Sequence, residues 1–138
     1  YEGGWDAIIK YLNKKGYEVV YISSQECTLE NVIDKSGERP LEERVLDICE
    51  SEFFIGLGSG LSWLAWACGA EVVMISGFSE VYTEFKCHRV INDNVCHGCF
   101  NHHLLEKGNW EWCPNNKDFE CTKTITPKMV IEKIEEII

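Results

Sequence analysis

Four cysteines in the last third of the chain constrain its fold more than any other feature. Cys96 and Cys99 form a C-x2-C turn, and Cys113 and Cys121 follow after thirteen and seven intervening residues. A C-x2-C turn directs two sulfur atoms toward one point, and Gly98 allows the backbone to turn tightly between them. The later pair would close the site from a distant part of the chain. Four thiolates suit zinc or iron, so the spacing predicts a metal finger.

The segment around these cysteines, residues 93–125, has no helical or strand period. An irregular stretch of this length in a compact domain needs its own source of folding energy, which metal binding supplies. Two disulfide bonds, or four unrelated thiols, are the alternatives. Because four thiolates close the coordination shell, a structural metal is favoured over a catalytic one. The neighbouring side chains of Cys87, His97, His102 and His103 are interpreted as surroundings of the site rather than as ligands.

Outside this segment, helical and strand patterns alternate. Strands are expected at residues 17–23, 53–57, 71–76 and 88–92. Helices are expected over residues 5–16, 40–48, 61–68 and 127–138, the last with Thr126 as its N-cap, and a short helical turn over 29–33. This order is typical of an α/β fold in which helical crossovers connect the strands of a parallel sheet.

Composition excludes several classes of protein. The 138 residues suit one domain, and no apolar run approaches the roughly 18 residues of a membrane span. The net charge of −10 argues against binding to a nucleic-acid backbone. The first residues lack the basic-then-apolar order of a signal peptide. Metal-bound thiols need no oxidising compartment, so a cytoplasmic location is expected.

A glycine-rich turn is the second informative motif. The apolar strand at residues 53–57 runs into Gly58-Ser59-Gly60, and a helix follows. Glycines let a backbone approach an anion, and the N-terminus of a helix offers free N–H groups and a positive dipole. Ser59 and Ser62 could add hydroxyl donors. Because no lysine follows, the pattern is not a Walker loop, and a plain tight turn explains it about as well as a phosphate site.

The glycine turn and the cysteine cluster together resemble one family, the bacterial autotransporter heptosyltransferases. The resemblance rests on residues 53–69 (FFIGLGSGLSWLAWACG), 74–79, 89–92, 95–100, 110–114 and 119–121. It extends over nearly the whole chain from Gly3 and corresponds to the C-terminal half of such an enzyme. That family is similar to the lipopolysaccharide heptosyltransferases, whose architecture of two Rossmann-like domains is called GT-B.

The resemblance implies a division of the chain and of its roles. Residues 1–92 would be a Rossmann-like portion that binds a nucleotide-sugar donor of the ADP-heptose type. Residues 93–125 would be an inserted finger, and residues 126–138 a helix that packs back on the Rossmann-like portion. The donor's diphosphate would be lined by Gly58, Ser59, Gly60, Leu61 and Ser62. The metal, iron with zinc as the alternative, would be held by Cys96, Cys99, Cys113 and Cys121.

The same resemblance implies that part of the enzyme is missing from this chain. The acceptor-binding domain, the strand leading into the helix near Gly3, the catalytic base and a phosphate-contacting lysine have no counterpart here, so no catalytic residue is assigned. An acceptor serine in an autotransporter-like protein would be bound by the missing domain. The isolated chain is expected to bind donor weakly and to transfer no sugar. Whether it forms a homo-oligomer is left open.

Two other functions compete with the glycosyltransferase interpretation. The chain could be a metal-finger interaction module without a substrate, with Trp110 and Trp112 as contact residues. It could also be a thiol oxidoreductase, since Cys96 and Cys99 form a C-x-x-C frame. The second is disfavoured because Cys113 and Cys121 complete a set of four ligands, whereas redox activity needs free thiols.

Overall fold

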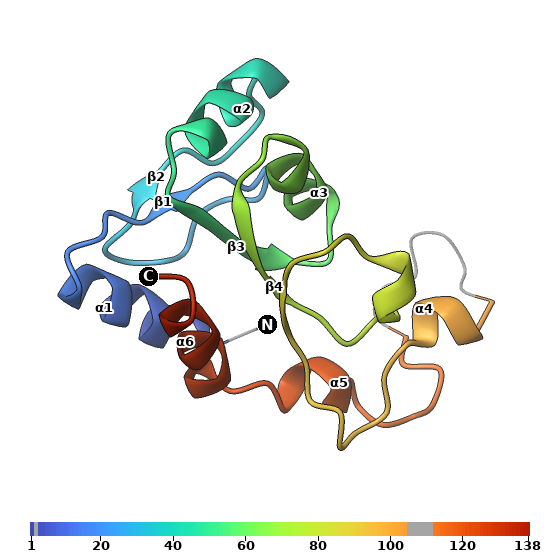
Figure 1. Cartoon of the computed structure of the whole chain (residues 1–138). Coiled ribbons are helices and arrows are strands. Elements are labelled where there is room, and N and C mark those ends of the chain that lie inside the picture. The colour runs from blue at the N-terminus through green and yellow to red at the C-terminus, as the bar shows by residue number, and fades with distance from the viewer. Residues whose placement is uncertain (2, 105–111) are drawn as a thin grey trace.

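The computed structural model describes residues 1, 3–104 and 112–138, which form an α/β fold (Figure 1). Its helices are α1 (Trp5–Lys14), α2 (Leu41–Cys49), α3 (Gly60–Ala67), α4 (Cys99–His102), α5 (Glu120–Lys123) and α6 (Pro127–Glu135), with a 3-10 turn, η1, at Val81–Thr83. Its strands are β1 (Val20–Tyr21), β2 (Ile33–Asp34), β3 (Phe53–Leu57), β4 (Glu71–Ile75) and β5 (His88–Val90). The predicted alternation of helices and strands is confirmed.

All strand pairs of the described residues are parallel, but they belong to two sheets. One sheet has the order β3-β4-β5, and the other pairs β1 with β2. A groove of about 570 Å³ lies between them and is lined by α1, β1, α2 and β3. The expectation of parallel strands with helical crossovers is therefore confirmed, whereas one continuous sheet is not observed among the described residues.

Strand β4 forms the centre of the core because both of its faces are covered. Val73 and Ile75 join a cluster with residues of α1 and α6, while Val72 and Met74 join a second cluster with residues of α2 and α3. These four side chains are at most 2% exposed. A strand buried on both faces reads as a continuous apolar run, which is the pattern of residues 72–75.

The helices cover the three-stranded sheet from two sides. Figure 1 shows α1 and α6 on one side of β3 and β4, with α2 and α3 on the other. Helix α1 buries Ile8, Ile9 and Leu12, whose spacing puts them on one face of the helix. Helix α6 packs against α1, β4 and β5 through residues that include Val130 and Ile134. The last segment of the chain thus closes one face of the core.

Three local predictions differ from the structure. No helical turn forms at residues 29–33, because Asn31 has a left-handed φ of +58° and the Ile33 N–H donates to the Val19 carbonyl as β2 begins. Pro40 is the N-cap of α2 rather than its first residue. The strand expected at residues 17–23 is regular only at Val20–Tyr21. A short strand with a single paired neighbour has few ladder hydrogen bonds to extend it.

The N-cap of α6 gives a stability prediction with an internal control. Thr126 accepts a hydrogen bond from the Met129 N–H, whereas Ser59, the N-cap of α3, makes no side-chain cap bond. We therefore expect Thr126→Ala to lower the free energy of unfolding by about 1 kcal/mol and Ser59→Ala to lower it by less. Urea denaturation measures both. Equal losses in the two variants would contradict the capping geometry.

Candidate functional site

The glycine turn lies where β3 passes into α3. The Ser59 N–H donates to the Leu57 carbonyl at 2.7 Å, which reverses the chain immediately after the strand. The Ser59 carbonyl then accepts from the N–H groups of Ser62 and Trp63 at 3.1 and 3.2 Å. Strand-to-helix turns of this kind place the first amides of the helix at the carboxyl edge of a parallel sheet, where α/β proteins bind ligands.

Ser62 holds the turn from inside. Its side chain is fully buried, and its hydroxyl donates to the Leu57 carbonyl at 2.5 Å. Gly56 makes room for this contact, since a Cβ there would lie 2.8 Å from the Ser62 Oγ and 2.5 Å from the Phe54 ring. The hydroxyl of Ser62 is therefore committed to the protein rather than directed to a ligand.

The other residues of the turn are open. Gly58, Ser59 and Gly60 are exposed, and Leu61 is half-buried. A Cβ on Gly60 would meet no atom within 4 Å. A Cβ on Gly58 would meet only Glu84, Met74 and Ser79, all at ordinary contact distances of 3.8 to 4.0 Å. The turn thus borders the end of β4 and the segment that follows it, with free space in front of Gly60.

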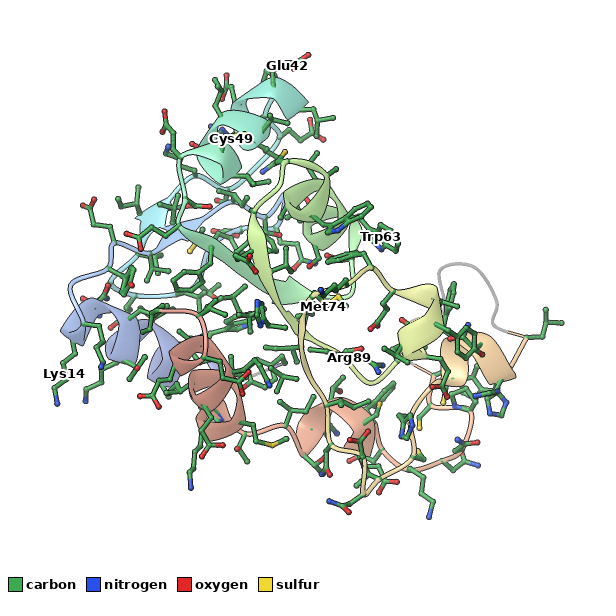
Figure 2. The ribbon with its side chains drawn as sticks, viewed as in Figure 1. Lys14, Glu42, Cys49, Trp63, Met74 and Arg89 are labelled. Atoms are coloured by element: carbon green, nitrogen blue, oxygen red, sulfur yellow. The ribbon has the colours of Figure 1, made fainter. Side chains whose placement is uncertain are left out.

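A charged cluster that was not predicted from the sequence lies beside the turn. Glu84, whose side chain is 5% exposed, accepts a hydrogen bond from the Ser76 hydroxyl at 2.7 Å and lies 2.7 Å from the Arg89 Nε, at an angle too bent for a hydrogen bond. Arg89 also donates to the Ser79 carbonyl at 2.5 Å. Figure 2 shows Arg89 and Met74 close to this edge of the sheet. Because Glu84 pairs with it, Arg89 offers little free positive charge to an anion.

The four finger cysteines come from separate local structures. Cys96 precedes Gly98, which has a φ of +77°, a left-handed conformation that favours glycine, and Cys99 begins α4. Cys113 lies in a turn after the undescribed residues 105–111, and Cys121 lies in α5. The positive φ of Gly98 agrees with the tight turn that the C-x2-C spacing predicted.

The finger thiols affect one another's pKa values. Burial raises the pKa of Cys99, and the neighbouring Cys96 and Cys113 raise it further. The pKa of Cys121 is raised by burial and then by the other three cysteines. Cys113 differs, because backbone hydrogen bonds from Phe119, Lys117 and Asn115 lower the pKa of its thiol. The Lys117 N–H lies 3.3 Å from the Cys113 sulfur, an arrangement that stabilises a thiolate.

The donor set fits a soft metal, but the described residues do not form a closed coordination shell. Four thiols from one region suit iron or zinc, and N–H groups directed at sulfur support metal-bound thiolates. Within residues 1, 3–104 and 112–138, however, no group of three or more Cys, His, Asp or Glu side chains is arranged to hold a metal ion. The ligand assignment to Cys96, Cys99, Cys113 and Cys121 therefore stays a prediction.

The finger is joined to the sheet at the exit of β4. The Gly98 N–H donates to the Gly77 carbonyl and the Phe100 N–H donates to the Phe78 carbonyl, each at 2.9 Å. Gly77 is buried with a φ of +148°, and a Cβ there would lie 2.6 Å from the Cys121 carbonyl oxygen. The backbone of the core thus contacts the C-x2-C turn and α5 at once.

Two of the residues interpreted as surroundings of the finger, His97 and His102, have partners of their own. His102 lies 2.9 Å from a carboxylate oxygen of Glu80, and the His97 Nδ1 lies 3.0 Å from the Val95 carbonyl oxygen. Burial raises the pKa of Cys87 to about 11, so its thiol is protonated at neutral pH. Trp112 is 43% exposed, and Trp110 lies outside the described residues.

None of the helices in the described ranges has the length and apolar character that a membrane crossing needs.

Comparison with known proteins identifies relatives of this chain. No family model matches it. It is 38% identical over 143 alignment positions, gaps included, to the autotransporter heptosyltransferase Aah of Escherichia coli. The alignment covers 92% of this chain and 37% of Aah. It is 31% identical over 153 residues to the inactive autotransporter heptosyltransferase BimC of Burkholderia thailandensis, with 98% of this chain and 36% of BimC covered. The chain thus spans little more than a third of these relatives.

Solved structures similar to this chain include two of a heptosyltransferase. The bacterial iron-containing dodecameric glycosyltransferase TibC from enterotoxigenic E. coli matches with a TM-score of 0.92 and 37% identity, covering 99% of this chain and 40% of TibC. The complex of TibC, a heptosyltransferase, with ADP-D-β-D-heptose matches with a TM-score of 0.88 over 97% of this chain. The chain is therefore homologous to one part of the autotransporter heptosyltransferases, between a third and two fifths of their length.

Proposed function

We propose that this chain is the donor-binding portion of a protein O-heptosyltransferase and that its glycine turn holds the donor's diphosphate. The observation that carries the proposal is the similarity to TibC, a heptosyltransferase that was crystallised with ADP-D-β-D-heptose and that matches 97% of this chain. The open turn at the carboxyl edge of the sheet supports it, because such edges bind nucleotides in many α/β proteins.

The charges around the turn indicate how a diphosphate would be bound. Arg89 is paired with Glu84, and the chain carries a net charge of −10. The attraction would therefore come from the backbone N–H groups of Gly58, Gly60 and Leu61 and from the N-terminal dipole of α3, with the exposed Ser59 hydroxyl as a further donor. Ser62 contributes by fixing the turn. Its hydroxyl, which the motif suggested as a donor to the ligand, donates instead to the Leu57 carbonyl.

The same groups would assist sugar transfer. As the bond between sugar and phosphate breaks, negative charge builds on the departing diphosphate. N–H groups that are already oriented by the turn stabilise this charge more strongly in the transition state than in the ground state. The base that deprotonates an acceptor serine would lie outside this chain, in an acceptor-binding domain. The 138-residue chain would bind donor without completing the reaction.

Gly60 allows donor binding to be tested without disturbing the fold. The Gly60→Ala methyl group would enter open space in front of the turn, and alanine is at least as favourable as glycine in a helix. We expect this variant to keep or slightly raise the Tm, and to weaken the binding of ADP and of ADP-heptose about tenfold, or ~1.4 kcal/mol. Isothermal titration calorimetry measures the Kd.

Lys10→Ala, an exposed change on α1 remote in sequence from the turn, is the matched control and should leave the Kd unchanged. Equal Kd values for Gly60→Ala and Lys10→Ala would remove the turn from the binding site. Failure of the unaltered, folded chain to bind ADP or ADP-heptose would overturn the proposed function itself. Because the relative BimC is described as inactive, donor binding and sugar transfer should be measured in separate assays.

The finger is proposed to hold iron through Cys96, Cys99, Cys113 and Cys121. TibC is described as iron-containing, which supports iron rather than the zinc alternative. The mutual effects of the four thiols on their pKa values and the N–H groups around Cys113 support the ligand set. A bound metal would supply folding energy to residues 93–125. The finger is attached to the core through Gly77 and Gly98. The metal would therefore have a structural role beside the sheet.

The remaining parts of the proposal concern the longer protein. TibC is dodecameric, which supports self-association of a protein that contains this chain. A serine acceptor in an autotransporter-like protein and a cytoplasmic location in a bacterium follow from the family resemblance. Transfer of heptose to such an acceptor by a protein that includes both domains is the test of these parts.

A further inference from the structure

Two cysteines outside the finger meet where α2 and α3 pack together. Cys49 is the last residue of α2, and Cys68 is the C-cap of α3. The two helices contact each other, Cys68 packs against the cluster that contains Ile48, and the Cys49 thiol is close enough to raise the pKa of Cys68. Figure 2 shows Cys49 on α2. Nineteen positions apart in sequence, the two sulfur atoms are therefore neighbours in space.

The two thiols differ in accessibility. Cys49 is exposed, whereas Cys68 is half-buried and packs against the cluster that contains Ile48 and Ala65. A small oxidant can therefore reach Cys49 directly, while Cys68 is held beside it by the packing of the helices. Burial raises the pKa of the Cys68 thiol, and the adjacent Cys49 raises it further, so Cys49 is the thiol expected to react first.

We propose that Cys49 and Cys68 form a reversible disulfide bond when the protein meets hydrogen peroxide. The Cys49 thiolate attacks one peroxide oxygen, the O–O bond breaks, and Cys49 becomes a sulfenic acid as one water leaves. The Cys68 sulfur then attacks the Cys49 sulfur, the S–O bond breaks, and a second water leaves. The two thiols lose two electrons and two protons in total, and peroxide is reduced to two waters. Thiol–disulfide exchange with a dithiol reductant restores both thiols.

This bond would tie together the ends of the two helices that cover one side of β4. The closed loop runs from residue 49 to residue 68 and includes β3 and the glycine turn. Cross-linking restricts the unfolded chain, so the oxidised protein should have a Tm higher by about 5 °C. The disulfide would act as a redox-sensitive brace of α3 against α2.

Tryptic cleavage after Arg44 and Lys86 makes the proposal directly measurable. The fragment of residues 45–86 contains Cys49 and Cys68 and no other cysteine. After treatment with hydrogen peroxide and then N-ethylmaleimide, we expect this fragment to have lost two hydrogen atoms and to carry no maleimide. Reduction with dithiothreitol before alkylation should restore two maleimides. Mass spectrometry reads both states in the unaltered chain, so the result does not depend on a variant that folds.

Substitutions separate this pair from general oxidation. In Cys49→Ser and Cys68→Ser the gain in Tm should vanish, whereas Cys27→Ser, which removes a thiol elsewhere in the chain, should leave both the linkage and the gain intact. A fragment 45–86 that still carries two maleimides when Cys27 has already been oxidised would overturn the proposal. So would a linkage of Cys49 or Cys68 to any other fragment in preference to each other.

Discussion

Replacing Gly77 with alanine is expected to lower the free energy of unfolding by roughly 2–4 kcal/mol. The φ of +148° at Gly77 strains any residue with a Cβ, and that Cβ would lie 2.6 Å from the Cys121 carbonyl oxygen. Since the backbone that follows β4 and the backbone of α5 cannot both keep their positions, the contact between the core and the finger should open. Thermal unfolding should show a decrease in Tm on the order of 10 °C.

Gly60→Ala is the matched control for this loss, because Gly60 has no positive φ and a Cβ there meets no atom within 4 Å. It makes the same chemical change without the strain or the contact. Hydrogen exchange adds a spatial readout, since Gly77→Ala should speed exchange at the Gly98 and Phe100 amides, which donate to Gly77 and Phe78. Unchanged exchange at these two amides would mean that the finger does not depend on Gly77.

Replacing Cys113 with serine should have the largest effect on the finger. If Cys113 is one of four ligands, its loss opens the coordination shell and removes the sulfur that three backbone N–H groups surround. Structural metal sites of this kind contribute on the order of 10 kcal/mol to the folding of their segments. We expect Cys113→Ser to lose the bound iron and its visible absorption, and to loosen residues 93–125 while the α/β portion stays folded.

Elemental analysis of Cys113→Ser beside Cys27→Ser provides the comparison. Cys27 lies outside the finger, and its thiol is 3.8 Å from the Leu29 carbonyl oxygen, so its loss should leave the iron content unchanged. Equal iron in the two variants would show that Cys113 is not a ligand. Zinc in place of iron in the unaltered protein would keep the ligand set and correct the metal.

Much of the core could be predicted from local sequence, because single elements carry strong signals. The apolar positions of α1, the continuous apolar run of β4 and the Thr126–Pro127 start of α6 each define an element without reference to the rest of the chain. Strand β2 could not be predicted in this way. It forms because Asn31 turns the backbone and Ile33 pairs with β1, a contact that only the tertiary fold creates.

The candidate site was predictable in its backbone but not in its side chains. Glycine and serine spacing indicated the turn, yet whether the Ser62 hydroxyl points outward or inward depends on Gly56, which brings β3 close to α3. The pairing of Glu84 with Arg89 joins the segment after η1 to β5, and no sequence period connects these two positions. Likewise, the close contact between Gly77 and the finger depends on the position of Cys121, 44 residues later.

Titration of the ¹⁵N-labelled chain with ADP-heptose, followed by amide NMR, tests the central claim most directly. We expect the largest shift changes at the amides of Gly58, Ser59, Gly60 and Leu61, with small changes at α1 and α6 on the other side of the sheet. A folded, metal-loaded chain whose amides do not move at saturating donor, or move mainly away from this turn, would contradict the assignment of the glycine turn as a donor-binding site.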